Sequence, residues 1–242
     1  MPQKLPFLIL SLLFIGFIPA RSKKSAKILV FCKTAGYHHA SIGPGKLAIM
    51  QLGAENNFSV DTSSDAAVFN PDNLKRYKAV VFLSTTGDIF NDEQQQAFQH
   101  YIHQGGGFVG VHAATDTEYG WEWYGKFIGA YFLSHPKQQE ALLHVIDRDN
   151  IATRHLPAEW KRWDEWYNFK NMDSSVHVLI TLDETSYEGG KNGNYHPMCW
   201  YHRFDGGRMF YTALGHTAES YADPLFLKHL LGGILYAMGR RS

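Results

Sequence analysis

The chain has 242 residues, of which 45% are hydrophobic and 19% charged, with 23 basic and 23 acidic side chains. This length and apolar content predict one α/β domain with a sizeable core, with two small domains as an alternative, and argue against disorder. The even charge balance offers no electrostatic footprint for DNA, RNA or an anionic membrane, so the expected partner is a small neutral molecule.

The first twenty residues, 1–20, are expected to form a secretory signal peptide. Lys4 precedes an apolar run over residues 5–18, and Pro19-Ala20 ends this run ahead of a cleavage point. The run is shorter than the roughly twenty residues of a transmembrane helix, with an uncleaved anchor as the alternative. The sequence therefore predicts export to the periplasm or the extracellular space. There Cys32 and Cys199 could pair in a disulfide or stay separate in the core.

Apolar strands and helices alternate through the rest of the chain. Residues 27–32 are a continuous apolar run typical of a strand buried on both faces, and a helix is expected over residues 45–52. Residues 58–62 and 77–84 are the next predicted strands. Asn91 is a good N-cap for a helix over residues 92–104, which three glycines end.

Residues 108–112 then form a short apolar strand, and further strands are expected over residues 141–147, 176–182 and 208–214. Residues 225–238 predict a closing amphipathic helix. Strand, helix and strand in this order imply right-handed crossovers and a parallel sheet. We therefore expect a doubly wound, mainly parallel sheet flanked by helices, in one domain over residues 27–238.

Histidines follow three of the predicted strands. In doubly wound sheets, ligands bind just beyond the carboxyl ends of the strands. His38 and His39 come after the first strand, His112 after the strand over residues 108–111, and His216 after residues 208–214. These strand ends predict a rim rich in histidine, where an imidazole can serve as general acid or base.

Five sequence blocks resemble the ThuA-like, or trehalose-utilisation, family. They are Gly36-Tyr-His-His-Ala-Ser-Ile42, residues 105–114, Asp164-Glu-Trp-Tyr167, His196-Pro197 with Trp200, and residues 207–216. The resemblance covers nearly all of the mature chain, from about residue 27 to residue 236, and implies a flavodoxin-like fold similar to class I glutamine amidotransferases. It also implies a role in disaccharide catabolism, often alongside sugar dehydrogenases that produce 3-keto sugars.

The resemblance excludes the chemistry of the glutaminases. In that superfamily a cysteine nucleophile sits on a tight turn after a central strand, and the equivalent turn here carries His112. Neither Cys32 nor Cys199 lies at that turn, so a thioester mechanism has no nucleophile.

His112 and Glu165 are the predicted catalytic pair. Glu165 is preferred to Asp164 because Glu165-Trp-Tyr167 resembles a family unit, although a solvated acidic pair is the alternative. Substrate-binding roles are expected for His38, Trp166, Tyr167, His196 and His216, with His135 and His155 as further candidates. Trp160, Trp163 and Trp166 recur every three residues and could form one helical face, with core packing as their other role.

These residues predict an exported enzyme that acts by acid–base chemistry on a small carbohydrate, a disaccharide or its 3-keto derivative. The reaction could be an elimination, an isomerisation or a hydrolysis. A sugar-binding accessory protein and a metal-dependent hydrolase are the alternatives. No cofactor is predicted, because the chain lacks dinucleotide-binding and P-loop motifs. A divalent metal would suit the histidines and the carboxylate, but no local ligand spacing indicates one.

Overall fold

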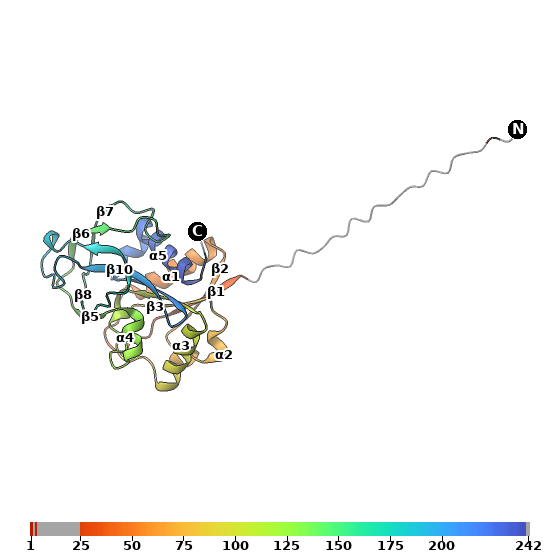
Figure 1. The fold of residues 1–242 in the computed structure, drawn as a ribbon, viewed down its shortest axis with the longest axis horizontal. Helices are drawn as coiled ribbons and strands as arrows, with labels where there is room; N and C mark the ends of the chain where they lie inside the picture. Colours follow the sequence, from red (N-terminus) through yellow and green to blue (C-terminus); the bar gives the residue numbers. More distant parts are fainter. Residues whose placement is uncertain (2, 4–24, 241–242) are drawn as a thin grey trace.

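The computed structural model describes residues 1, 3 and 25–240 (Figure 1). The predicted signal peptide lies outside these residues, apart from Met1 and Gln3. None of the described helices is long and apolar enough to cross a membrane.

Five parallel strands form the first half of a nine-stranded sheet. They are β1 (Ala26–Phe31), β2 (Phe58–Ser63), β3 (Ala79–Leu83), β4 (Gly107–Val111) and β11 (Gly207–Thr212), in the order β2-β1-β3-β4-β11. This order is the flavodoxin-like one, with β11 as the fifth parallel strand. Every residue of β3 and β4 is buried, which explains their unbroken apolar runs. The predicted fold class is confirmed.

The second half of the sheet is antiparallel. It continues from β11 through β10 (Pro197–Phe204), β9 (His177–Leu182), β6 (Gln139–Val145) and β7 (Glu159–Asp164). The strands β5 (Tyr131–Ser134) and β8 (Asn168–Lys170) form a separate small sheet. The sequence predicted β6 and β9, and the stretch around Cys199 also favoured a strand, which is β10, but β7 was not predicted.

The expected helical face of tryptophans is wrong. Trp160 and Trp163 lie in β7, whose residues alternate between exposed and buried, and Trp166 follows the end of that strand. Trp160 is buried, but Trp163 has 57% of its surface exposed. A spacing of three residues places side chains on opposite faces of a strand, because successive strand residues alternate with a period of two.

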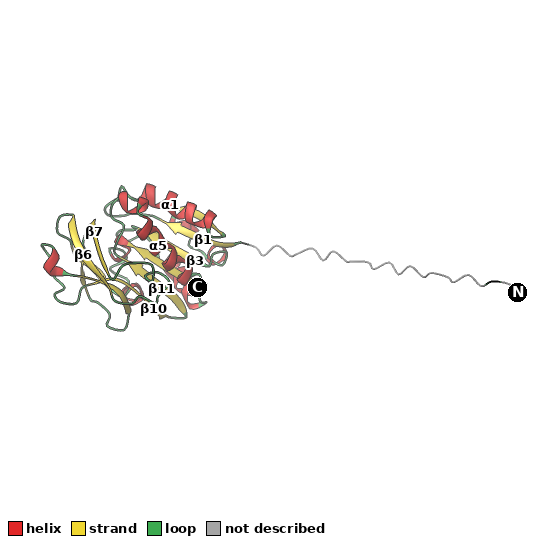
Figure 2. Ribbon diagram, turned by 90° about the horizontal axis from the view of Figure 1, so that it is seen from above, coloured by secondary structure: helices red, strands yellow, loops and turns green. Residues whose placement is uncertain are grey.

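Helices cover both faces of the sheet. α1 (Ile42–Glu55) and α5 (Pro224–Ala237) lie together on one face, and α2 (Pro71–Leu74), α3 (Asp92–His103) and α4 (Glu122–Ile128) lie on the other (Figures 1 and 2). The predicted N-cap of α3 is confirmed. Asn91 Oδ1 accepts a hydrogen bond from the Gln94 amide at 2.9 Å, and Gln94 Oε1 accepts one from the Asn91 amide at 3.0 Å. This capping box sets the start of α3 locally.

Cys32 and Cys199 are both buried free thiols. Cys32 follows β1 and Cys199 lies in β10. Cys32 and Cys199 are therefore not paired in a disulfide in this structure. Burial raises the pKa of both thiols, so both are poor nucleophiles.

A buried histidine in α5 predicts that acid destabilises the fold. His229 is fully buried, and burial lowers its pKa from 6.5 to about 3. The unfolded chain takes up a proton near pH 6.5 that the folded chain refuses, so stability falls as pH drops below that value. We expect this histidine to cost about 2 kcal/mol of unfolding free energy between pH 7 and pH 5.

Urea unfolding at the two pH values measures this loss. In His229→Gln the loss is expected to be about 2 kcal/mol smaller than in the wild type. Ile234→Val, at a buried position in the same helix, should lower stability by about 1 kcal/mol while keeping the wild-type pH dependence. Equal pH dependence in the wild type and His229→Gln would contradict the prediction.

Candidate functional site

Three strand ends and the segment after β7 bring four side chains together. His39 comes after β1, His112 after β4, His216 after β11 and Glu165 after β7. One nitrogen or oxygen from each of these residues lies within 4.8 Å of the others. The three imidazole rings meet edge to face, with centroids 4.9 to 5.2 Å apart. We call these four residues the histidine–glutamate cluster.

His112 occupies a strained turn at the end of β4. Its φ is 51°, in the left-handed region that costs about 1–2 kcal/mol for a residue with a Cβ. Its fully buried ring places Nδ1 2.9 Å from the Ala213 carbonyl oxygen. A carbonyl only accepts hydrogen bonds, so Nδ1 carries a proton and Nε2 faces the cluster. Such strain at a strand end is typical of functional turns.

Three atoms of the cluster form a tight triangle. His112 Nε2 lies 3.0 Å from His216 Nδ1 and 3.4 Å from Glu165 Oε2, and His216 Nδ1 lies 3.1 Å from Glu165 Oε2. Burial by itself raises the pKa of Glu165, but the hydrogen bonds and charges of His112 and His216 outweigh it and hold the pKa well below its usual range. Glu165 is therefore an ionised carboxylate, and at least one proton or cation must lie within this triangle.

His39 completes the cluster as a neutral ring. It is buried, and its Nδ1 has no hydrogen-bond partner among the described residues. Burial first, and then the neighbouring His112 and His216, lower its pKa to about 3. A neutral imidazole with an unused nitrogen can accept a proton or bind a metal ion.

The cluster lies against a cavity of about 360 Å³. The cavity is lined by Tyr37, His39, Asp116, Phe132, His135, Gln138, Glu165, Tyr167 and His216. The Tyr167 ring centroid lies 4.3 Å from that of His112 and 4.3 Å from that of Phe132. Burial raises the pKa of the Asp116 carboxyl, which accepts a hydrogen bond from the Tyr119 hydroxyl at 2.6 Å. Aromatic walls with a few converging polar groups suit a small polar ligand.

The structure gathers four of the seven predicted site residues at this cavity: His112, Glu165, Tyr167 and His216. Asp164, the less favoured acid of the pair in the sequence, points into the protein instead and is fully buried. Asp164 and Glu165, although adjacent in the chain, therefore lie in different environments.

His38, Trp166 and His196 lie elsewhere, which corrects their predicted placement. His38 is exposed, with its Nδ1 3.2 Å from Thr34 Oγ1, and His39 takes the place expected for it. Trp166 is fully buried and donates to the Gln139 carbonyl at 2.9 Å. His196 is also buried, 2.8 Å from the Tyr167 carbonyl and 2.8 Å from Glu184, so it can support Tyr167 from behind.

Sequence reasoning missed Asp116 and Gln138 and ranked His135 too low. His135 Nδ1 lies 3.2 Å from Glu165 Oε1, and Gln138 Nε2 lies 2.7 Å from His216 Nε2. Asp116 could have been found, because it lies in the turn after the same strand as His112. His135 and Gln138 lie beyond β5 with no local signal of their role. The other lower-ranked candidate, His155, lies outside the cavity, with its Nε2 3.0 Å from the Leu225 carbonyl oxygen in α5.

The profile of the ThuA family, described as trehalose utilisation, matches residues 27–237. The chain belongs to the ThuA family. Among curated proteins, none matches it.

Solved structures of this family share the fold. A candidate ThuA-like protein from Bacteroides uniformis is 23% identical, with a TM-score of 0.75, over 91% of this chain and 95% of that one. Another from Parabacteroides merdae is 21% identical, with a TM-score of 0.75, over 90% and 92%. A candidate GMP synthase protein from Thermoplasma acidophilum is 13% identical, with a TM-score of 0.51, over 88% and 96%. This last likeness agrees with the amidotransferase-like fold.

Proposed function

We propose that this ThuA protein is an exported enzyme of carbohydrate catabolism that acts on a disaccharide or its 3-keto derivative. The observation that carries the proposal is the buried triangle of His112, His216 and the ionised Glu165 beside a cavity with aromatic walls. The family description, trehalose utilisation, supports the substrate class. The apolar run over residues 5–18 supports export.

Proton transfer is the chemistry that these residues suit. A keto group at C3 makes the neighbouring C–H bonds acidic, so a base can remove that proton. Glu165 is ionised, and nitrogens of His216 and His112 lie 3.1 and 3.4 Å from its Oε2, so these rings can share a proton that the carboxylate takes up. In an elimination, the C–O bond to the leaving sugar breaks and its oxygen takes a proton. Asp116, whose pKa burial raises, is placed at the cavity to donate it.

Product analysis tests the proposal. Purified protein is incubated with trehalose, simple glucosides and their 3-keto forms, and turnover of at least one is expected. Saturable sugar binding without any product would instead assign the chain the role of an accessory binding protein. If the protein neither binds nor turns over any of these sugars, the proposed substrate class is overturned.

A metal-dependent reaction is a second candidate, favoured by the geometry of the triangle. A circle through atoms 3.0, 3.1 and 3.4 Å apart has a radius of about 1.8 Å, so one ion could lie about 2.0–2.1 Å from all three. The unpaired Nδ1 of His39 could serve as a fourth ligand. The Nδ1–H of His112 donates to a backbone carbonyl, as metal-binding histidines commonly do. Three imidazoles and a carboxylate suit zinc or a similar ion.

Metal titration tests this candidate. We expect the purified chain to bind about one Zn²⁺ or Co²⁺, and His39→Ala to weaken that affinity at least tenfold because a ligand is lost. Elemental analysis and the visible spectrum of the Co²⁺ form measure both. His38→Ala is the matched control, because this exposed neighbour lies outside the cluster. If the chain binds neither Zn²⁺ nor Co²⁺ and a chelator does not change turnover, the metal-dependent reaction is excluded.

A further inference from the structure

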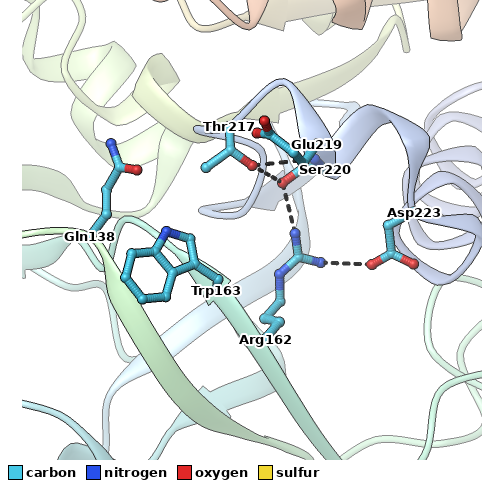
Figure 3. A pocket seen from close by; sticks show the side chains of 7 residues that line it. All are labelled: Gln138, Arg162, Trp163, Thr217, Glu219, Ser220 and Asp223. Atoms are coloured by element: carbon cyan, nitrogen blue, oxygen red, sulfur yellow. Dashed lines mark hydrogen bonds and ion pairs between the residues drawn. The ribbon is translucent and has the colours of Figure 1, made fainter.

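The protein has a second cavity, of about 490 Å³ (Figure 3). It is lined by Gln138, Arg162, Trp163, Thr217, Glu219, Ser220 and Asp223. Gln138 lines both cavities, and Thr217 directly follows His216 in the chain. Trp163 and Glu165 flank Asp164 on either side. The two cavities are therefore neighbours that share a wall.

Trp163 gives the second cavity a large exposed ring. It lies in β7, which pairs only with β6 in the described part of the sheet, and 57% of its surface is exposed. Figure 3 shows the indole next to the Gln138 side chain, across the cavity from Ser220. A tryptophan buries more apolar surface than other side chains when covered. An exposed one that lines a cavity therefore indicates a ligand with an apolar face, such as a pyranose ring.

The opposite wall is rich in hydrogen-bonding groups. Arg162 is 8% exposed; its Nη2 donates to Ser220 Oγ at 2.8 Å and its Nη1 to Asp223 at 3.5 Å (Figure 3). Its buried Nε has no partner among the described residues. Thr217 Oγ1 lies 3.1 Å from Ser220 Oγ. This wall presents donors and acceptors that match the hydroxyl groups of a sugar.

We propose that the second cavity binds the second sugar ring of the substrate, stacked on Trp163. The inference rests on the proposed function and narrows it, because the enzyme then requires two linked rings and discriminates against monosaccharides. Gln138 lies at the boundary, and its amide contacts His216 Nε2 at 2.7 Å. The sugar ring bound on Trp163 would thus lie next to the histidine–glutamate cluster, which acts on the first sugar ring.

Calorimetry with sugars of one and two rings tests the subsite. The probes are trehalose and 3-keto-trehalose for two rings, and methyl α-glucoside and 3-keto-glucose for one. Trp163→Ala is expected to weaken two-ring binding about tenfold, a stacking loss of about 1.4 kcal/mol, and to change one-ring binding less than twofold. Trp163→Phe should restore most of the lost affinity. Tyr195→Ala, an equally exposed aromatic that lines neither cavity, should bind as the wild type does.

The outcomes separate the subsite from the proposed function. Equal effects of Trp163→Ala on one-ring and two-ring sugars would overturn the subsite and leave the proposed function standing. Wild-type protein that binds none of the four probes would overturn the proposed function, and the subsite with it. Unchanged sugar binding with a shift from dimer to monomer in sedimentation would assign Trp163 to an interface between copies of this chain, which also overturns the subsite.

Discussion

Glu165→Gln is expected to lower kcat for the carbohydrate substrate by about 10²–10⁴-fold, the usual contribution of a general acid or base. The amide has nearly the shape of the carboxylate but cannot take up a proton. It also removes the negative charge that the His112 and His216 rings surround. Initial rates over a range of substrate concentrations measure the effect, and KM should change far less than kcat.

Two further variants separate chemistry from folding. His112→Asn should show a similar loss, since asparagine tolerates the φ of 51° at this turn but lacks the imidazole. His38→Ala should keep wild-type rates, because that ring is exposed outside the cluster. A Glu165→Gln variant with wild-type kcat would refute the proposed acid–base role.

Asp164→Ala is expected to destabilise the fold by about 3–5 kcal/mol, the cost of leaving a buried charge without its partner. Asp164 is fully buried and accepts hydrogen bonds from Arg162 Nη2 and from the Gly215 and His216 amides, each at 3.1 Å. It therefore ties the end of β7 to the loop after β11. Without it, Arg162 keeps only the longer ion pair to Asp223, at 3.5 Å.

Urea unfolding measures this loss, with Glu219→Ala as the matched control. Glu219 is an exposed acid that lines the same cavity as Arg162, and its removal should change stability by less than about 0.5 kcal/mol. The double variant Arg162→Met with Asp164→Leu should be more stable than Asp164→Ala, because no unpaired charge remains. A loss below about 1 kcal/mol in Asp164→Ala would show that Asp164 does not stabilise the fold in this way.

Local signals predicted the parallel half of the sheet well. The apolar runs of β1, β3 and β4 and the capping box at Asn91 are set by residues close in the chain, so periodicity and composition reveal them. β7 was missed because its residues 159–164 mix tryptophans with charged side chains. Such an edge strand forms only because β6 supplies its hydrogen-bonding partner.

The sequence by itself determined the α/β class, the strand after which His112 lies and that no cysteine stands at the turn that carries His112. Only the tertiary structure decided that His39 rather than His38 joins the cluster. It also decided that Asp164 holds the scaffold while Glu165 faces the cavity, and that His135 and Gln138 reach it. The side chains of adjacent residues point in different directions, which the backbone conformation at each residue sets. At these positions that conformation depends on contacts between residues far apart in the chain. The positions of most strands along the chain are indicated by local patterns, whereas side-chain direction at the strand ends depends on packing that no short segment contains.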